Sequence, residues 1–343
     1  MRDSLRRRLT ILAAAIGLGL AAAPHARAAD QASVQLDWVV RGDHALFFVA
    51  RDKGFFRENG IDVTAIRRGT GSGDALRLVA NGNAQFGFAD LPTLMVGRGR
   101  DVPDVALVAT NQASPLAMIA LAKTHQLRHV TDLKGLNVGV DPTGSTYVFL
   151  KALLGANGMS LAEIKQSTMS HPYENFLLLG RVDVVPGYVD AEVPELEAKA
   201  GGPGSLSVLL GADAGYVAYG SGLFTSARMI HDHPDLVRRF TKAYLEAFRS
   251  VVEDPEGAVK ITVAANPEYA GKAGVLLAQL KADLASTFFS PDTKAHGIGW
   301  IDSARWAATA KMLHDYGGGL ADPAKTEGGF DMTFLTDAKP LRR

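Results

Sequence analysis

The chain has 343 residues, with 36 basic and 36 acidic side chains, nine histidines and no cysteine. Without cysteine there is neither a disulfide framework nor a thiolate metal site. Residues 1–28 hold five of the arginines and one aspartate, so the remaining chain carries 31 basic and 35 acidic residues, a net charge of −4. This mildly acidic balance, with no basic block, argues against nucleic acid as a partner.

The first 28 residues are predicted to be a signal peptide. Arg2 and residues 6–8 form a basic start, residues 9–23 are apolar, and Ala26-Arg27-Ala28 offers a small-x-small cleavage pattern. A membrane anchor is the alternative, but the apolar run is shorter than the roughly 20 residues that span a bilayer. Arg7-Arg8 leaves twin-arginine export open beside ordinary secretion. We therefore expect cleavage near Ala28 and a periplasmic protein.

Short apolar strands alternate with helical patterns along most of the chain. In chain order the pattern predicts strand 34–39, helix 44–59, strand 61–67, helix 73–81, strand 84–89, helix 91–97, strands 105–110, 116–122 and 137–140, helix 145–158, strands 182–186 and 206–210, and helices 234–253 and 255–264. Such alternation predicts an α/β fold with mostly parallel sheets. There is no internal repeat of 20–50 residues.

The segment Leu36–Val63 carries a family resemblance. It reads Leu-Asp-Trp, five further residues, His-Ala-Leu-Phe-Phe-Val-Ala, then Lys-Gly-Phe-Phe and Asn-Gly-Ile-Asp-Val. This order of strand, loop, amphipathic helix, glycine stop and strand resembles the start of the NMT1/THI5-like solute-binding proteins that feed ABC importers. Residues Gly69–Asp90, Leu133–Ser145 and Arg181–Asp190 extend the resemblance over most of the chain.

The resemblance implies a periplasmic-binding-protein type II fold, with two α/β lobes joined by two chain crossings. The pattern restarts near residue 114 and returns near residue 224, so Asn111–Leu116 and Tyr219–Phe224 are the candidate hinges. Their small residues tolerate the backbone changes of hinge closure. We expect lobe 1 to hold residues 29–113 and 225–320 and lobe 2 to hold residues 114–224. Residues 321–343 are expected to form a loose tail.

A glycine-rich loop, Gly69-Thr-Gly-Ser-Gly-Asp74, follows one predicted strand and opens the next predicted helix. Glycines let the backbone approach a ligand, and free amides at a helix start attract negative charge. Gly71 and Ser72 are therefore candidate contacts, and the resemblance implies that this loop lines the cleft. The alternative is a capped turn in which Ser72 or Asp74 satisfies helix amides. Asp90, at the end of the next strand, either faces the cleft or caps the following helix.

The loop Asp141–Tyr147 repeats this arrangement in the second half of the chain. Two helix N-termini, one in each lobe, would then face each other across a cleft. That geometry suits a ligand with an anionic or strongly accepting group. Ser145 and Thr146 are the preferred donors, and the alternative is an ordinary helix N-cap at Thr143 or Ser145.

The end of the first strand is a further candidate, because ligands of open α/β sheets bind at the carboxyl ends of strands. Trp38 is predicted to stack on a planar ligand and to contribute roughly 1 kcal/mol beyond its burial; the alternative is a core position. His44 is a candidate cleft donor, because members of the family with a Leu-Asp-Trp start often carry Asp-His here. Alternatively, His44 is merely the first helical residue and Asp43 its N-cap.

Residues Gly187–Glu192 follow a buried strand of the second half. The family carries an aromatic and an acidic residue near this point. Tyr188 is therefore predicted to stack opposite Trp38, and Asp190 or Glu192 to accept hydrogen bonds from amino or ring N–H groups of the ligand. The alternative is that Asp190 caps the following helix and Glu192 lies in its first turn, where the helix dipole favours a carboxylate.

The resemblance implies a small-molecule ligand, an ABC permease and its ATPase as partners, a monomer, and neither catalysis nor a cofactor. The Leu-Asp-Trp start resembles the branch that binds aminopyrimidine thiamine precursors, but that branch often has Pro-Asn where this chain has Arg41-Gly42. Riboflavin, aromatic carboxylates and sulfonates therefore stay open. One alternative is an enzyme like the yeast-type pyrimidine synthase, which the missing cysteine and the histidine spacing disfavour. The other is a ligand sensor that signals to a membrane receptor.

Overall fold

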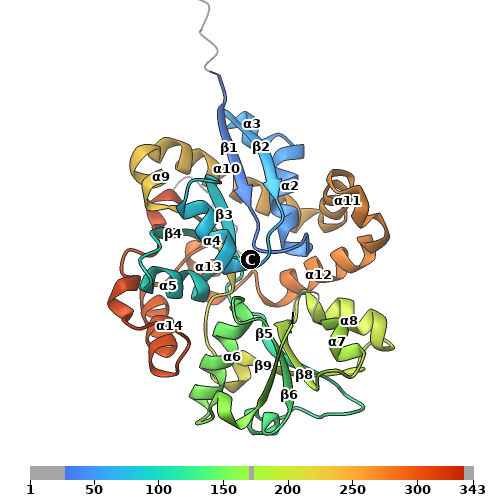
Figure 1. Ribbon diagram of the computed structural model, residues 1–343. Coiled ribbons are helices and arrows are strands. Elements are labelled where there is room, and N and C mark those ends of the chain that lie inside the picture. The colour runs from blue at the N-terminus through green and yellow to red at the C-terminus, as the bar shows by residue number, and fades with distance from the viewer. Residues whose placement is uncertain (1–27, 170–173, 336–343) are drawn as a thin grey trace, which may run out of the picture.

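The computed structural model describes residues 28–169 and 174–335. The predicted signal peptide, residues 1–28, falls almost wholly outside this part of the chain. Within the described ranges, none of the helices is both long and apolar enough to cross a membrane. The described chain forms two lobes, each built on one five-stranded sheet (Figure 1).

The sheet of lobe 1 has the strand order β2-β1-β3-β10-β4. Strand β10 is antiparallel to both of its neighbours, while the other four strands share one direction. Its strands are β1 (Asp30–Gln35), β2 (Ile61–Arg67), β3 (Phe86–Asp90), β4 (Asp104–Ala109) and β10 (Ser221–Ser226).

The sheet of lobe 2 repeats this plan with the order β7-β6-β8-β5-β9, and here β5 is the reversed strand. Its strands are β5 (Leu116–Leu121), β6 (Asn137–Val140), β7 (Lys165–Thr168), β8 (Val184–Tyr188) and β9 (Leu206–Leu210). The predicted two-lobed α/β fold is thus confirmed, and four of the five strands in each sheet run the same way.

The reversed strand of each sheet is the one that follows a crossing between the lobes. Because β5 and β10 start at the boundary and run away from it, the carboxyl ends of the other strands point toward the boundary. The two crossings are hydrogen-bonded to each other: Asn111 N donates to Ser221 O, and Gly220 N donates to Asn111 O, both at 2.9 Å. The loops that leave both sheets therefore meet between the lobes.

Helices cover both faces of each sheet. Those of lobe 1 are η1 (Gly42–His44), α2 (Ala45–Asp52), α3 (Phe55–Glu58), α4 (Ser72–Ala80), α5 (Leu91–Gly99), α9 (Ala227–Asp232), α10 (Pro234–Glu253), α11 (Pro255–Ala265), η5 (Pro267–Lys272), α12 (Ala273–Ser286), α13 (Pro291–His296), α14 (Ser303–Asp315), η6 (Pro323–Thr326) and η7 (Met332–Leu335). Those of lobe 2 are η2 (Val130–Leu133), α6 (Ser145–Ala156), η3 (Leu161–Glu163), α7 (Glu174–Leu178), α8 (Glu192–Ala200) and η4 (Gly211–Ala214).

Three helices of lobe 1, namely α5, α12 and α14, also contact lobe 2. Helix α12 packs beside α8, and α14 packs against both α5 and α6 (Figure 1). One hydrophobic cluster consequently continues across the boundary, from Leu94 of α5 through Leu313 of α14 to Leu153 of α6. The lobes are thus joined by packed side chains as well as by the two crossings.

The structure differs from the predicted elements where local signals were weak. The first residue of the predicted helix 44–59 belongs to η1, and the rest is divided into α2 and α3, because Gly54 adopts a left-handed conformation with φ of 85°. Strand β7 was not predicted, since its Lys-Gln-Ser-Thr sequence has no apolar run. Strand β10 begins at Ser221 and belongs to the first sheet, whereas the predicted boundary of lobe 2 was residue 224. We keep the lobe limits as a proposal, with β10 assigned to lobe 1.

The segment from residue 321 to residue 335 is not the loose tail that was predicted. Phe334 is buried in the core of lobe 1, and Trp306 Nε1 donates a hydrogen bond to Thr326 O at 3.2 Å. Ala106 N also donates to Gly329 O at 2.9 Å, so the segment pairs with β4. Its glycines and charged residues suggested a polar tail, but its few aromatic residues anchor it. Residues 336–343 lie outside the described residues.

The aromatic stack at the centre of lobe 1 yields a test of this packing. Phe240 of α10 is fully buried, with ring centroids 3.6 Å from Phe86 and 4.6 Å from Phe56. We expect Phe240→Ala to lower the free energy of unfolding by about 3–5 kcal/mol, because it leaves a cavity in the core. Urea denaturation measures this change. Val217→Ala, at a position that is 59% exposed, is the control and should stay within about 0.5 kcal/mol. If both variants changed the free energy of unfolding by similarly small amounts, the result would contradict the central packing of Phe240.

Candidate functional site

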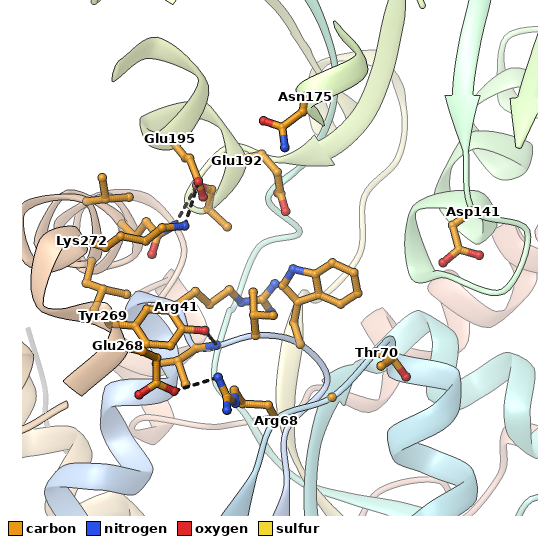
Figure 2. A pocket seen from close by; sticks show the side chains of 18 of the residues that line it. Arg41, Arg68, Thr70, Asp141, Asn175, Glu192, Glu195, Glu268, Tyr269 and Lys272 are labelled. Atoms are coloured by element: carbon orange, nitrogen blue, oxygen red, sulfur yellow. Dashed lines mark hydrogen bonds and ion pairs between the residues drawn. The ribbon is translucent and has the colours of Figure 1, made fainter. Parts of the chain in front are cut away.

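A cavity of about 910 Å³ lies between the two lobes. This volume is within the range of about 300–1,000 Å³ that is typical of small-molecule sites. Figure 2 shows Arg68, Glu268 and Tyr269 of lobe 1 on one side and Asn175 and Glu192 of lobe 2 on the other. The cavity is lined by residues 38–41 and 68–70, Asp141, Thr168, Met169, Asn175, Ala191, Glu192, Glu195, Lys199, Glu268, Tyr269, Lys272, Val275, Leu276 and Gln279.

The loops at the carboxyl ends of four strands supply about half of this lining. Residues 38–41 follow β1 and residues 68–70 follow β2 in lobe 1, whereas Asp141 follows β6 and residues 191–192 follow β8 in lobe 2. This is the edge where open α/β sheets bind ligands. The remaining lining comes from the end of β7, with Thr168 and Met169, and from η5, α7, α8 and α12.

The glycine-rich loop lies against the loop that follows β1. Gly69 N donates to Trp38 O at 3.0 Å, and Gly71 N donates to Asp37 O at 2.7 Å. A Cβ at Gly69 would lie only 2.1 Å from Leu36 O, so glycine is required by this close approach. The hydroxyl of Ser72 accepts a hydrogen bond from Asp90 N at 3.1 Å. The loop therefore fixes the backbone that carries Trp38.

A recess of about 30 Å³, enough for one water molecule, lies where the two polar loops meet. Trp38, Arg41 and Glu192 line both the recess and the large cavity, so the two adjoin. Ser145 Oγ and Tyr188 Oη share a hydrogen bond of 2.7 Å here. Seven of the ten predicted site residues line this recess: Trp38, Gly71, Ser72, Ser145, Thr146, Tyr188 and Glu192.

The other three predicted residues are buried behind these walls. His44 Nε2 lies 2.9 Å from Asp37 Oδ1. Asp90 caps α5, because its Oδ1 accepts hydrogen bonds from Thr93 N and Oγ1. Asp190 is hydrogen-bonded to Asp283 of α12. These three side chains can support the site, whereas direct contact with a ligand would need a change in the walls.

Sequence reasoning did not identify the buried arginine at the centre of the site. Arg41 Nη2 lies 2.9 Å from Asp37 Oδ2, and Arg41 Nε lies 3.0 Å from Asp43 Oδ1. Across the lobe boundary, the guanidinium lies over the ring of Tyr188, 4.9 Å from its centroid. Burial alone would lower the pKa of Arg41, but the two aspartates raise it well above its usual value. Arg41 thus occupies a face of the ring that was predicted to stack on the ligand.

A pair of buried carboxyl groups also joins the lobes. Asp190 follows β8 of lobe 2, and its partner Asp283 accepts a hydrogen bond from Asn111 Nδ2 at 2.8 Å. Burial raises the pKa of Asp190 to about 6. Burial, together with the charges of Asp190 and Asp43, raises the pKa of Asp283 well above its usual range. The raised pKa of Asp283 favours its protonated form, which can donate a hydrogen bond to Asp190.

The cations of the cavity wall are all paired with carboxylates. Besides Arg41, Arg68 lies 2.8 Å from Glu268, and Lys199 and Lys272 each lie 3.0 Å from Glu195. The pair between Lys272 and Glu195 joins the two lobes across the cavity (Figure 2). Among the lining residues in the described part of the chain, positive charge is thus matched by negative charge.

Several cavity residues had no signal in the sequence, notably Asn175, Lys272 and Gln279. Gln279 bridges the lobes, since its Oε1 accepts from Gly42 N at 3.1 Å and its Nε2 donates to Ala191 O at 2.9 Å. Lys272 and Gln279 lie in a long helical region without the strand-end signal that led to the other candidates. For Arg41, the available signal was an arginine flanked by Asp37 and Asp43 in a mostly apolar segment.

The architecture is that of the periplasmic solute-binding proteins, two α/β lobes with a ligand-sized cavity between them. The structure of the alkanesulfonate-binding protein SsuA from Xanthomonas axonopodis pv. citri matches it with a TM-score of 0.66 at 15% identity, over 88% of this chain and 98% of that one. The family model described as NMT1/THI5 like matches residues 41–258. The chain therefore belongs to the NMT1/THI5-like family, as predicted.

Two relatives are similar over nearly their whole length. The riboflavin-binding protein RibY of Chloroflexus aurantiacus is 25% identical over 322 residues, which cover 92% of this chain and 89% of RibY. The formylaminopyrimidine-binding protein of Halalkalibacterium halodurans is 24% identical over 308 residues, covering 88% and 90%. A pyrimidine phosphate synthase of Saccharomyces cerevisiae is 25% identical over 249 residues, covering 70% and 72%.

The buried ion cluster yields a test with a matched control. We expect Arg41→Met to lower the free energy of unfolding by about 3–5 kcal/mol, because it leaves two buried carboxylates without their partner. Arg68→Met removes an arginine from a pair in which both side chains are about half exposed, and we expect a loss below about 1 kcal/mol. Denaturant unfolding of both variants measures the difference. Equal losses would show that the Arg41 cluster is no more important for stability than a surface ion pair.

Asp90 yields a pH-dependent test. Burial raises its pKa to about 7, although hydrogen bonds from Thr93 oppose this. Between about pH 4 and pH 7 the folded protein keeps a proton that the unfolded chain releases, so its free energy of unfolding falls as pH rises, by up to about 1.4 kcal/mol per unit. Asp90→Asn keeps a capping oxygen and removes this penalty. Its stability relative to the parent should therefore increase from pH 5 to pH 8, and parallel pH profiles would contradict the raised pKa.

Proposed function

We propose that this protein is the periplasmic solute-binding component of an ABC importer. In this proposal it captures a planar nitrogen heterocycle, of the pyrimidine or flavin class, in the cavity between its lobes. The observation that carries the proposal is this cavity of about 910 Å³, lined from both lobes by an indole, hydrogen-bonding groups and paired charges. A thiamine pyrimidine precursor is the first candidate, and riboflavin is the larger alternative.

The lining suits a flat ligand that bears both donors and acceptors. Trp38 is half-buried on the wall and offers an aromatic surface to stack on. The oxygens of Asn175, Glu192 and Glu195 can accept hydrogen bonds from amino and ring N–H groups. The ammonium of Lys272 can donate to ring nitrogen or carbonyl acceptors. Polar groups that converge on a ligand beside apolar surface fix the orientation of the ligand and provide specificity.

Charge pairing favours a neutral ligand over a sulfonate or a carboxylate. An anion would have to compete with Glu268 for Arg68, or with Glu195 for Lys199 and Lys272. Such competition costs the pairs already formed. The likeness to the alkanesulfonate-binding protein is one of fold, whereas the two binding proteins that align along most of the chain are named for nitrogen heterocycles.

Export and delivery complete the proposal. The predicted signal peptide would place the protein in the periplasm, where the lobes close over the ligand and the closed form docks on the permease and its ATPase. The binding-protein relatives align over about nine tenths of both chains and the yeast synthase over about seven tenths, which favours binding over catalysis. A sensory role differs in that the closed form would signal to a receptor and would not stimulate a permease–ATPase complex.

The ligand class is tested by titration calorimetry of the purified protein. The panel contains an aminopyrimidine, a formylaminopyrimidine, riboflavin, benzoate and an alkanesulfonate. We expect one heterocycle to bind with one-to-one stoichiometry and to raise the melting temperature, by about 2.7 kcal/mol of added stability at a hundredfold excess over its dissociation constant. Tight binding of the sulfonate or benzoate alone would overturn the heterocycle assignment. It would also show that the ion pairs of the wall open for anions.

Substitution of Trp38 gives the most specific test of the proposed ligand contacts. We expect Trp38→Ala to weaken binding of the heterocycle about tenfold or more, because it loses stacking worth about 0.5–1.5 kcal/mol as well as apolar contact. Trp300→Ala is the matched control, since Trp300 stacks on His296, with ring centroids 4.5 Å apart, and is not among the cavity residues. Calorimetry with each variant gives the affinities. If the folded Trp38→Ala variant bound the heterocycle with unchanged affinity, stacking on Trp38 would not contribute to binding.

A further inference from the structure

A second cavity, of about 500 Å³, also lies between the lobes. Helices α4 and α5 of lobe 1 form one side, and α6 of lobe 2 with its preceding loop forms the other. Helix α5 packs against α6 beside it (Figure 1). The charged residues of its lining are Asp74, Arg77, Arg100 and Lys151.

Two polar loops separate this cavity from the first. Gly71 and Gly144 line both the second cavity and the recess of the ligand site, and Thr70 lines both large cavities. A Cβ at Gly73 would lie 3.4 Å from Thr143 O of the other lobe, so the loops are in close contact. The second cavity is thus a distinct space on the far side of that contact.

The positive charges of the second cavity are only partly matched. Arg77 Nη2 lies 2.5 Å from Asp74 Oδ1. Arg100 of lobe 1 and Lys151 of lobe 2 have no carboxylate within 4.0 Å among residues 28–169 and 174–335. Two cations, one from each lobe, therefore line the same cavity without a carboxylate partner.

The position of the Lys151 ammonium is restricted by its surroundings. Lys151 Nζ lies 5.4 Å from the ring centroid of Tyr147, and a Cβ at Gly319 would lie 3.2 Å from it. Burial, and second the charge of Arg100, lower the pKa of Lys151. The charge of Arg100, an exposed side chain of lobe 1, therefore disfavours the charged form of the partly buried Lys151 of lobe 2.

We propose that this second cavity binds a small oxyanion, of the phosphate or carboxylate class, between Arg100 and Lys151. Arg100 has a planar fork of donors that matches such a group, and Lys151 supplies a point charge from the other lobe. An anion between them replaces repulsion by two attractions and completes the hydrogen bonding of a half-buried ammonium. Because one cation comes from each lobe, a bound anion also holds the lobes together. This inference does not depend on the ligand of the main cavity.

Titration calorimetry with inorganic phosphate tests the site, with succinate as the carboxylate arm and chloride holding the ionic strength constant. We expect saturable binding at one site, weakened at least tenfold in Lys151→Gln and in Arg100→Gln. Lys123→Gln is the matched control, because it removes one charge from an exposed position of lobe 2 and should bind phosphate like the parent. Lys151→Arg keeps the charge and should retain binding. Circular dichroism confirms that each variant is folded.

Either of two results would contradict the proposed anion site. The first is the lack of saturable heat up to about 20 mM phosphate or succinate, which excludes even millimolar affinity. The second is equal affinity in the parent, Lys151→Gln and Arg100→Gln, which places any bound anion elsewhere. Since the titration contains no heterocycle, neither result depends on whether the main cavity binds one.

Discussion

The buried guanidinium of Arg41 is the interaction on which the site depends. It joins the strand-end aspartate of lobe 1, Asp37, to Asp43 at the start of the following helix, and it covers the ring of Tyr188 in lobe 2. A buried charge is tolerated only when its partners are fixed. The same cluster that neutralises Arg41 therefore sets the backbone that presents Trp38 to the cavity, and ties that backbone to the opposite lobe.

The topology explains why such a cluster forms at the boundary. Each crossing starts one reversed strand, so the remaining strands of both sheets send their carboxyl ends to the same place. Polar loops from both lobes then meet there, and their charges must be paired across the boundary. Two further pairs of polar side chains join the lobes, namely Asp190 with Asp283 and Glu195 with Lys272. Pairing of polar groups between lobes is thus a general property of this cleft.

Much of the fold and part of the site could be predicted from local sequence signals. Strand-end loops with glycine and hydroxyl residues led to Gly71, Ser72, Ser145 and Thr146, which gather in one recess. Arg41 was missed because its flanking aspartates indicate only a local ion cluster, whereas its contact with Tyr188, 147 positions away in the chain, is what places it at the lobe boundary. Helices α12 and η5 were missed as cavity walls for the same reason, since tertiary packing alone brings them to the strand ends.

The central claim is that one ligand is held by both lobes at once, and hydrogen–deuterium exchange tests it most directly. Exchange is followed with and without the heterocycle that binds in calorimetry. The account predicts simultaneous protection of residues 38–41 and 68–70 in lobe 1 and residues 191–199 in lobe 2, because these segments line one cavity. Protection confined to one lobe, or to segments away from the cavity, would contradict the account.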